Sequence, residues 1–163
     1  MTRTEPAYRL LTAAAIVWCA LVVSPPLLAL TEGTVGASSV VRAFFTPVCH
    51  QWSSHSLHLL GAPLAVCARC SAIYLGFLAG VLLAPSIRRG LPVRTTLMVA
   101  LLPMLLDVAL DLAPWYDPGV VSRVLTGSWF GLLAGIVLTP IIVDAVTRLF
   151  ADPLPRTRTR ISP

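Results

Sequence analysis

The sequence predicts an all-α integral membrane protein, built as a four-helix bundle. Of its 163 residues, 56% are hydrophobic and only 12% are charged. The mean hydropathy is +0.83, far above that of a soluble domain, which needs much more polar surface. Four apolar segments each approach the roughly 20 residues that a helix needs to cross about 30 Å of hydrocarbon. One compact domain is expected at this length.

The first helix is expected at about residues 8–30, with Pro25 and Pro26 near its end. A cleaved signal peptide is the alternative, because Val35-Gly36-Ala37 resembles a cleavage site. The apolar stretch is longer than the core of a typical signal peptide, which favours a retained helix. In both cases the segment that follows reaches the outer side of the membrane.

Three more helices are expected along the chain. The second is the shortest, stops before Arg88-Arg89, and takes residues 62–70 as its outer end. The expected bounds of the later helices are about 65–87, 95–113 and 124–146. Residues 1–150 thus form one four-helix transmembrane domain with a Cys/His loop at 42–70, and residues 151–163 form a basic flexible tail.

Arginines determine the expected orientation, since the chain contains no lysine. The N-terminus, the second connection and the C-terminus carry nine arginines, whereas the first and third connections carry three. Cytoplasmic segments are enriched in positive charge, which places both termini in the cytoplasm and the Cys/His loop outside. We therefore expect a multi-pass protein of the cell membrane, with the lipid bilayer as its partner and no nucleic acid bound.

The second and fourth helices contain similar sequences. Residues 74–85 and 129–140 are identical at six of twelve positions, and both segments run from outside to inside. This predicts a 2+2 parallel repeat of a two-helix unit, with chance similarity between apolar helices as the alternative.

Glycines at four-residue spacing mark the same two helices. They are Gly76, Gly80, Gly127, Gly131 and Gly135. This spacing lets two helix backbones approach closely in a membrane. We expect the second and fourth helices to touch along these faces, with homodimerisation through the same glycines as the alternative.

The segment from Cys49 to Cys70 carries most of the metal-binding side chains. It contains three cysteines and three histidines within 22 residues, whereas the rest of the chain has only Cys19. Thiolate and imidazole are the usual ligands of zinc, and the spacing fits a Cys3His site. The expected ligands are Cys49, His50, Cys67 and Cys70, with His55 and His58 as other candidates for the fourth position.

Redox chemistry is the alternative at these cysteines. The expected position outside the membrane permits a disulfide, which would staple the loop of a structural or partner protein. In a thiol–disulfide oxidoreductase, Cys67 and Cys70 would cycle and Cys49 would resolve the mixed disulfide. A c-type haem is not expected, because Ser71 stands where a histidine is required.

Ionisable residues inside apolar helices form a second candidate site. Asp107 and Asp111 are four apart on the third helix, and their expected partners are Arg69 and Arg123. If a bound metal activates water, Asp107 would act as the base and an arginine would hold an anionic lipid or phosphate. The alternative is an ion-pair network that only fixes helix register.

The string C-H-Q … C-A-R-C-S-x-I-Y-x-G, from Cys49 to Gly76, resembles the signature of a family of small bacterial and archaeal membrane proteins, domain of unknown function 2085. The similarity continues in Pro103-Met104-x2-Asp107 and Arg123-x2-Thr126-Gly127. His55 and Val108 stand where the family usually has arginine and glycine, which leaves His50 the stronger ligand candidate. The resemblance implies no known activity, so whether the protein is an enzyme stays open.

Overall fold

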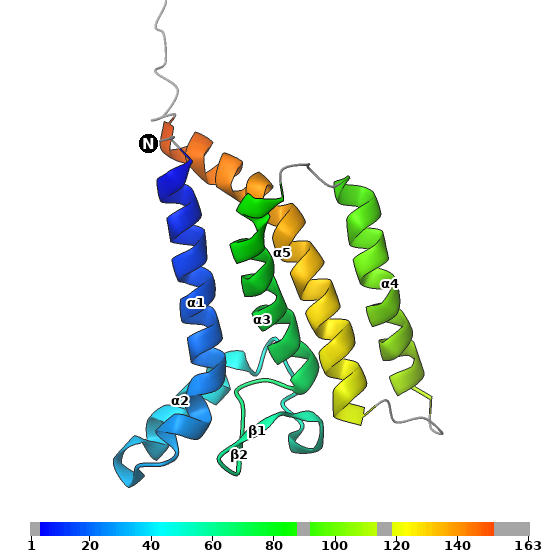
Figure 1. The fold of residues 1–163 in the computed structure, drawn as a ribbon. Coiled ribbons are helices and arrows are strands. Elements are labelled where there is room, and N and C mark those ends of the chain that lie inside the picture. The colour runs from blue at the N-terminus through cyan, green and yellow to red at the C-terminus, as the bar shows by residue number, and fades with distance from the viewer. Residues whose placement is uncertain (1–3, 88–91, 114–118, 152–163) are drawn as a thin grey trace, which may run out of the picture.

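The computed structural model of the protein describes residues 4–87, 92–113 and 119–151 (Figure 1). Within these residues, four helices are long and apolar enough to cross a membrane, which confirms the all-α membrane class. The basic tail from residue 152 and the arginines at 88 and 89 lie outside the described residues. The elements are α1 (Glu5–Leu28), η1 (Glu32–Thr34), α2 (Val35–Phe45), η2 (Ser53–His55), β1 (His58–Leu59), β2 (Ala62–Pro63), α3 (Ala68–Leu83), η3 (Ala84–Ser86), α4 (Val93–Asp111) and α5 (Gly119–Ala151).

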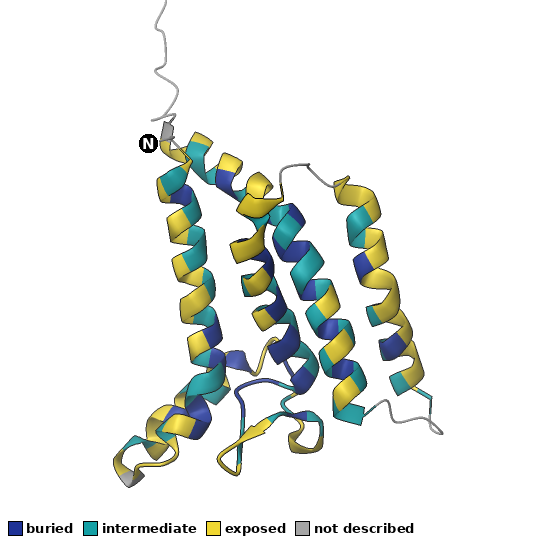
Figure 2. Cartoon of the chain, in the orientation of Figure 1, coloured by how far each residue is buried: buried dark blue, intermediate teal, exposed yellow. Residues whose placement is uncertain are grey.

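Helices α3 and α5 form the central pair. Helix α1 packs beside α3 and also touches α5, while α4 packs against α5 on the other side (Figure 1). The start of α1 and the end of α5 lie at one end of the molecule, and the loop with β1 and β2 lies at the opposite end (Figure 1). The outward faces of α1 and α4 are largely exposed, as expected for helices that meet lipid (Figure 2).

Glycines bring α3 and α5 into backbone contact, as the spacing predicts. A Cβ atom at Gly76 would lie 2.6 Å from the backbone oxygen of Ser128, and one at Gly127 would lie 2.6 Å from that of Arg69. Gly80 meets Gly135 further along both helices, so the two helices run in the same direction. These glycine faces are therefore covered within a single chain.

Helix α5 extends beyond the expected range of 124–146 at both ends. Its 33 residues span about 50 Å at 1.5 Å per residue, which exceeds the hydrocarbon thickness of about 30 Å. Pro140 lies inside the helix, and the ribbon bends in this region toward the start of α1 (Figure 1). Proline removes one backbone hydrogen bond and crowds the preceding turn, which accounts for the bend.

The connection between α1 and α3 differs most from expectation. Helix α2 was not expected, and its 11 residues are too few to cross a membrane. Residues 62–67 were expected to extend the second helix outward, but α3 begins only at Ala68. The backbone N–H of Ala65 instead donates to the carbonyl of Val22 on α1, and Ala62–Pro63 pairs with β1.

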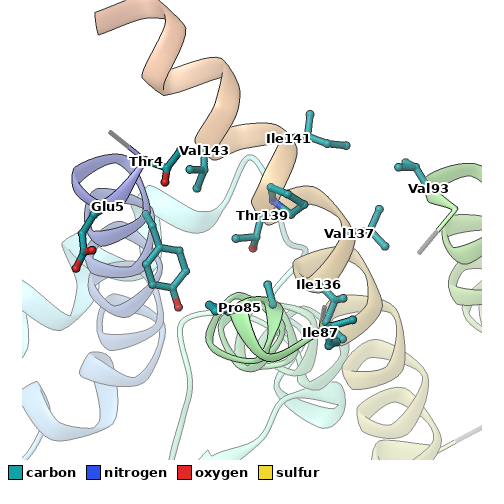
Figure 3. A pocket seen from close by; sticks show the side chains of 13 residues that line it. Thr4, Glu5, Pro85, Ile87, Val93, Ile136, Val137, Thr139, Ile141 and Val143 are labelled. Atoms are coloured by element: carbon teal, nitrogen blue, oxygen red, sulfur yellow. The ribbon is translucent and has the colours of Figure 1, made fainter. Parts of the chain in front are cut away.

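A cavity of about 720 Å³ lies at the end of the molecule opposite this connection (Figure 3). Its walls come from the start of α1, from η3, from the start of α4 and from the bent region of α5, with Glu5, Pro85 and Thr139 among the lining residues. This cavity is far from the loop that contains the clustered cysteines.

Substitution of Gly131 by alanine tests the central helix pair. The added methyl group would collide with the backbone of Ile73, and we expect a loss of about 1–3 kcal/mol in the free energy of unfolding. The measurement is unfolding by sodium dodecyl sulfate in detergent micelles. Gly36→Ala is the matched control, because a Cβ there meets nothing within 4 Å. Equal stability of the two variants would contradict the close contact.

Candidate metal centre

Three thiols gather at the start of α3. The sulfur atoms of Cys49, Cys67 and Cys70 all lie within 4.8 Å of one another, and all three cysteines are free. Tetrahedral zinc, with Zn–S distances of about 2.3 Å, places its sulfur ligands about 3.8 Å apart. The donor set and its spacing therefore fit a soft or borderline metal ion.

Helix α3 positions two of these thiols. Cys67 has extended backbone angles, φ −63° and ψ 165°, and immediately precedes the helix, while Cys70 lies in its first turn. The two sulfurs lie on the same side of this turn, since both belong to the three-thiol group. The positive end of the helix dipole lies beneath them and favours thiolates over thiols.

The third thiol is held by a turn after α2. The backbone N–H of Cys49 donates to the carbonyl of Phe45 at 3.1 Å, and its sulfur accepts the backbone N–H of Cys67 at 3.1 Å. Gln51, with a left-handed φ of 54°, donates its side-chain amide to the carbonyls of Arg42 and Ala65, at 2.6 and 2.8 Å. This bridge fixes the turn against the segment that leads into α3.

Arg42 adds a second clamp across the same loop. Its guanidinium donates to the carbonyls of Pro63 and Leu64, at 3.3 and 3.1 Å. With the bonds of Gln51, these contacts satisfy backbone carbonyls that form no helical hydrogen bond. The path from β2 to Cys67 is therefore fixed from the side of α2.

The thiols lie against an apolar and aromatic wall. Buried Val22, Phe45 and Val66 form a core cluster with Cys49, and Cys67 and Cys70 pack against it. The ring of Trp18 packs edge-on against Phe45 and Tyr74, with centroid distances of 5.2 and 5.7 Å. Such surroundings restrict access of bulk water to the sulfurs.

The thiols lie close enough to one another to shift their pKa values in opposite directions. Hydrogen bonds from the side chains of Cys67 and Cys70 hold the pKa of Cys49 far below its ordinary value, although burial opposes this. The hydrogen bond to Cys49 is the main cause that raises the pKa of Cys67. These hydrogen bonds therefore favour ionisation of Cys49 over ionisation of Cys67.

The histidines lie outside the three-thiol group among the described residues. His50 is exposed, and its ring packs edge-on against Trp52 at 6.5 Å. His55 lies in η2 and also contacts Trp52, while His58 lies in β1, where Nδ1 is 3.0 Å from the carbonyl of Ser56. The structure therefore brings together three of the four expected ligands and places His50 apart.

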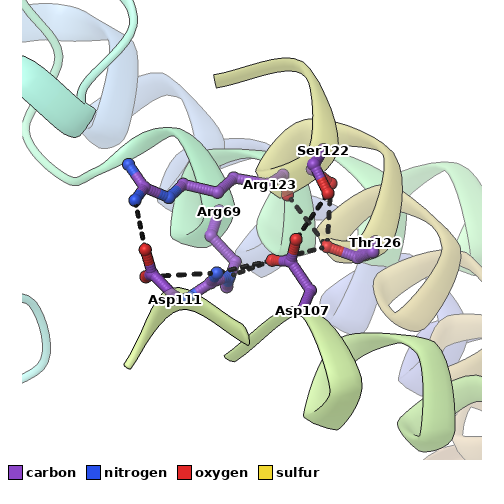
Figure 4. A network of polar contacts seen from close by, with 6 residues as sticks. All are labelled: Arg69, Asp107, Asp111, Ser122, Arg123 and Thr126. Carbon is purple, nitrogen blue, oxygen red and sulfur yellow. Dashed lines mark hydrogen bonds and ion pairs between the residues drawn. The ribbon is translucent and has the colours of Figure 1, made fainter. Parts of the chain in front are cut away.

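A network of charged side chains joins α3, α4 and α5 (Figure 4). Asp107 on α4 is only 4% exposed and accepts hydrogen bonds from three side chains. These come from Arg69 Nε at 3.1 Å, Ser122 at 2.5 Å and Thr126 at 3.3 Å. Its carboxylate is therefore engaged by donors from both α3 and α5.

Asp111 and Arg123 complete this network. Arg123 is 3% exposed and lies 2.5 Å from Asp111, which is also 3.6 Å from Arg69. Two arginines and two aspartates leave no net charge, which is the arrangement that makes buried ions tolerable in a membrane. The network joins α3, α4 and α5 near the thiols.

Sequence reasoning missed several residues that build these sites. Gln51 lies within the C-H-Q string, but its bridging role depends on a backbone turn that the sequence does not reveal. Ser122 and Thr126 are four apart, so they share one face of α5 and could have been paired with Asp107. Arg69 lies between Cys67 and Cys70, and therefore connects the two sites through one helical turn.

The chain is similar to a known family of membrane proteins and to an archaeal protein. A family model described as "Predicted membrane protein (DUF2085)" matches residues 49–137, which include all three clustered thiols and the whole charged network. An uncharacterised protein of Methanocaldococcus jannaschii is 30% identical over 117 residues, or 69% of this chain and 75% of that protein. No solved structure matches the chain.

Replacement of Asp107 by asparagine tests the charged network. It leaves the positive charge of Arg69 without its closest partner, and we expect the free energy of unfolding to fall by about 3–5 kcal/mol. Asp144→Asn is the control, because its pair with Arg148 is exposed and should contribute less than about 1 kcal/mol. Unfolding in detergent measures both, and an equal, small effect would argue against a buried network.

Proposed function

The chain belongs to the DUF2085 family of predicted membrane proteins, and from this premise we propose that Cys49, Cys67 and Cys70 bind a zinc ion at the extracytoplasmic face of the membrane. The observation that supports the proposal is the mutual approach of three sulfurs within 4.8 Å. A structural disulfide would use only two of them and would leave the third thiol buried in an apolar wall.

The hydrogen bond from the Cys67 backbone to the Cys49 sulfur also favours a metal. Metal-bound thiolates commonly accept such bonds, which stabilise their negative charge and orient the ligand. Three protein ligands with a fourth, open position are typical of catalytic zinc sites, in which the ion polarises a bound oxygen. His50 would close the position only after movement of the exposed loop, so we propose the open form and a metal-dependent membrane enzyme.

Under this proposal, Arg69, Asp107 and Arg123 position the site. Asp107 was expected to be a general base; we propose a positioning role in its place, because its carboxylate already accepts hydrogen bonds from three side chains. Its ion pair with Arg69 instead holds the turn of α3 that carries Cys67 and Cys70. We infer that the network sets the orientation of the thiols.

A thiol–disulfide oxidoreductase is the second candidate function. It is favoured by the free Cys67-x2-Cys70 pair at a helix N-terminus. In that reaction the two thiols would lose two electrons and two protons to a disulfide substrate, which would be reduced to two thiols. Cys49 would then compete as the resolving thiol.

Metal analysis tests the proposed centre. We expect about one equivalent of zinc per chain in detergent-purified protein by elemental mass spectrometry, and its loss in Cys67→Ser and Cys70→Ser, because two thiolates hold zinc far less tightly than three. Cys19→Ser is the matched control, since Cys19 is buried beside Tyr74 and lies outside the cluster.

Two results would contradict a zinc centre. Metal-free parent protein whose three clustered thiols react with iodoacetamide would favour the oxidoreductase. Zinc that persists in both serine variants would place the ion elsewhere in the chain.

Cysteine labelling tests the orientation that the arginines support. We expect Ser54→Cys in the exposed loop to react with a membrane-impermeant maleimide in intact cells, because the loop faces outside. Thr95→Cys, exposed at the start of α4, should react only after the membrane is permeabilised. The parent protein measures the background from its own thiols, and the opposite pattern of labelling would invert the topology.

A further inference from the structure

Helix α2 has one face that the described chain leaves uncovered. Val40 and Phe44, four residues apart on this face, are 69% and 59% exposed. At 3.6 residues per turn, the exposed Gly36, Ala37 and Ala43 fall with them within an arc of about 120°. These five residues form the apolar face of α2, which contains no polar side chain. The buried residues of α2 lie on its opposite face, where the helix packs onto the protein.

This helix and the end of α1 form a hairpin. The hydroxyl of Ser38 donates to the carbonyl of Pro25 at 3.0 Å, and the ring of Phe44 packs edge-on against Trp18 at 6.0 Å. The contacts move back along α1 as the chain advances along α2, so the two helices run antiparallel. Because α1 is a candidate membrane span, α2 is held beside a helix that lipid surrounds.

The hairpin lies at the level where hydrocarbon gives way to lipid headgroups. The N–H of Ala65 donates to the carbonyl of Val22, so α3, which begins at Ala68, starts close to this level of α1. Helix α1 continues from Val22 to Leu28, or about 9 Å further at 1.5 Å per residue. Headgroups add about 5–8 Å to each side of the hydrocarbon core. Figure 1 shows the hairpin to one side of the bundle, at the end where α3 begins.

The composition of the hairpin suits lipid better than water. From Leu10 to Val41 the chain has a single charged residue, Glu32. Leu27 and Leu30 are 50% and 64% exposed and add to the apolar surface. Helices that lie in the plane of a membrane bury an apolar face about 5–10 Å into the boundary between headgroups and acyl chains. The other face of such a helix is usually charged, whereas that of α2 is covered by protein.

We propose that α2 is an interfacial helix, whose apolar face lies in the lipid leaflet on the side of the thiols, at the boundary between headgroups and acyl chains. Lipid is the occupant, and not a second copy of the chain, because the contact of Phe44 with Trp18 makes this face continuous with the surface of a membrane span. The bilayer then also supports Cys49, whose N–H donates to the carbonyl of Phe45 at the end of α2. This placement holds whether or not the thiols bind a metal.

Photo-crosslinking tests the proposal on the full chain, reconstituted into vesicles of phosphatidylethanolamine and phosphatidylglycerol. The photoreactive residue p-benzoylphenylalanine, placed at Val40, should form a lipid adduct that is measured as added mass of the intact protein. Leu102 is the positive reference, because it is 65% exposed on the α4 span. Ser39 is the matched control, since it is exposed on α2 but turned by about 100° from Val40. All three positions are exposed, so the added ring leaves the packed core unchanged.

The yields at these positions decide between lipid and other surroundings of α2. We expect the yield at Val40 to lie within about threefold of that at Leu102 and to exceed that at Ser39 at least about fivefold. A yield at Val40 no higher than at Ser39, with adducts formed at Leu102, would mean that α2 lies in water and would overturn the proposal. Crosslinking of Val40 to a second chain would mean that two copies meet here, and would also overturn it.

Lipid charge provides a second test. The apolar face of α2 has no charged side chain, so vesicles of phosphatidylcholine alone should give the same yield at Val40 within about twofold. A yield that requires phosphatidylglycerol would show attraction by charge and contradict seating through apolar contact.

Discussion

Backbone contact between α3 and α5 is the constraint on which the rest of the structure depends. Inside a bilayer, apolar surface gains little from leaving lipid, so helices associate through close packing. Gly76, Gly80, Gly131 and Gly135 provide that packing along the whole pair. The contact continues to Gly127, which lies against the backbone of Arg69. The glycine contacts therefore help to place the turn that carries the thiols.

The first turn of α3 contacts two different environments. On one side Cys67 and Cys70 meet aromatic rings and α1, and on the other Arg69 meets the carboxylates of α4. Neither side tolerates an unpaired charge, because both are shielded from water. The charged network is neutral within itself, whereas three ionised cysteines would need a cation. This difference is the physical reason why we propose metal binding at the thiols and a positioning role for the ion pairs.

Much of this arrangement was predictable from the sequence. The lengths of the apolar segments predicted the four candidate spans, and the glycine spacing predicted which helices touch. Asp107 pairs with an arginine, as predicted. Helix α2 was missed because 11 residues give no membrane signal, and its bonds to α1 are tertiary. The exposed position of His50 follows from the turn at Gln51. The left-handed backbone of this turn cannot be predicted from the presence of a glutamine. Loop geometry of this kind depends on contacts between distant segments.

The glycine contact also limits how the two faces of the membrane can communicate. Interlocked backbones cannot slide or rotate past each other without collision, since the space for a single methyl group is lacking at Gly76. Piston movement of α3 along α5 would therefore have to break this backbone contact. Helices α1 and α4, which flank this rigid pair, are the elements left to move. A change of shape in the bundle would therefore involve α1 and α4 more than the α3–α5 pair.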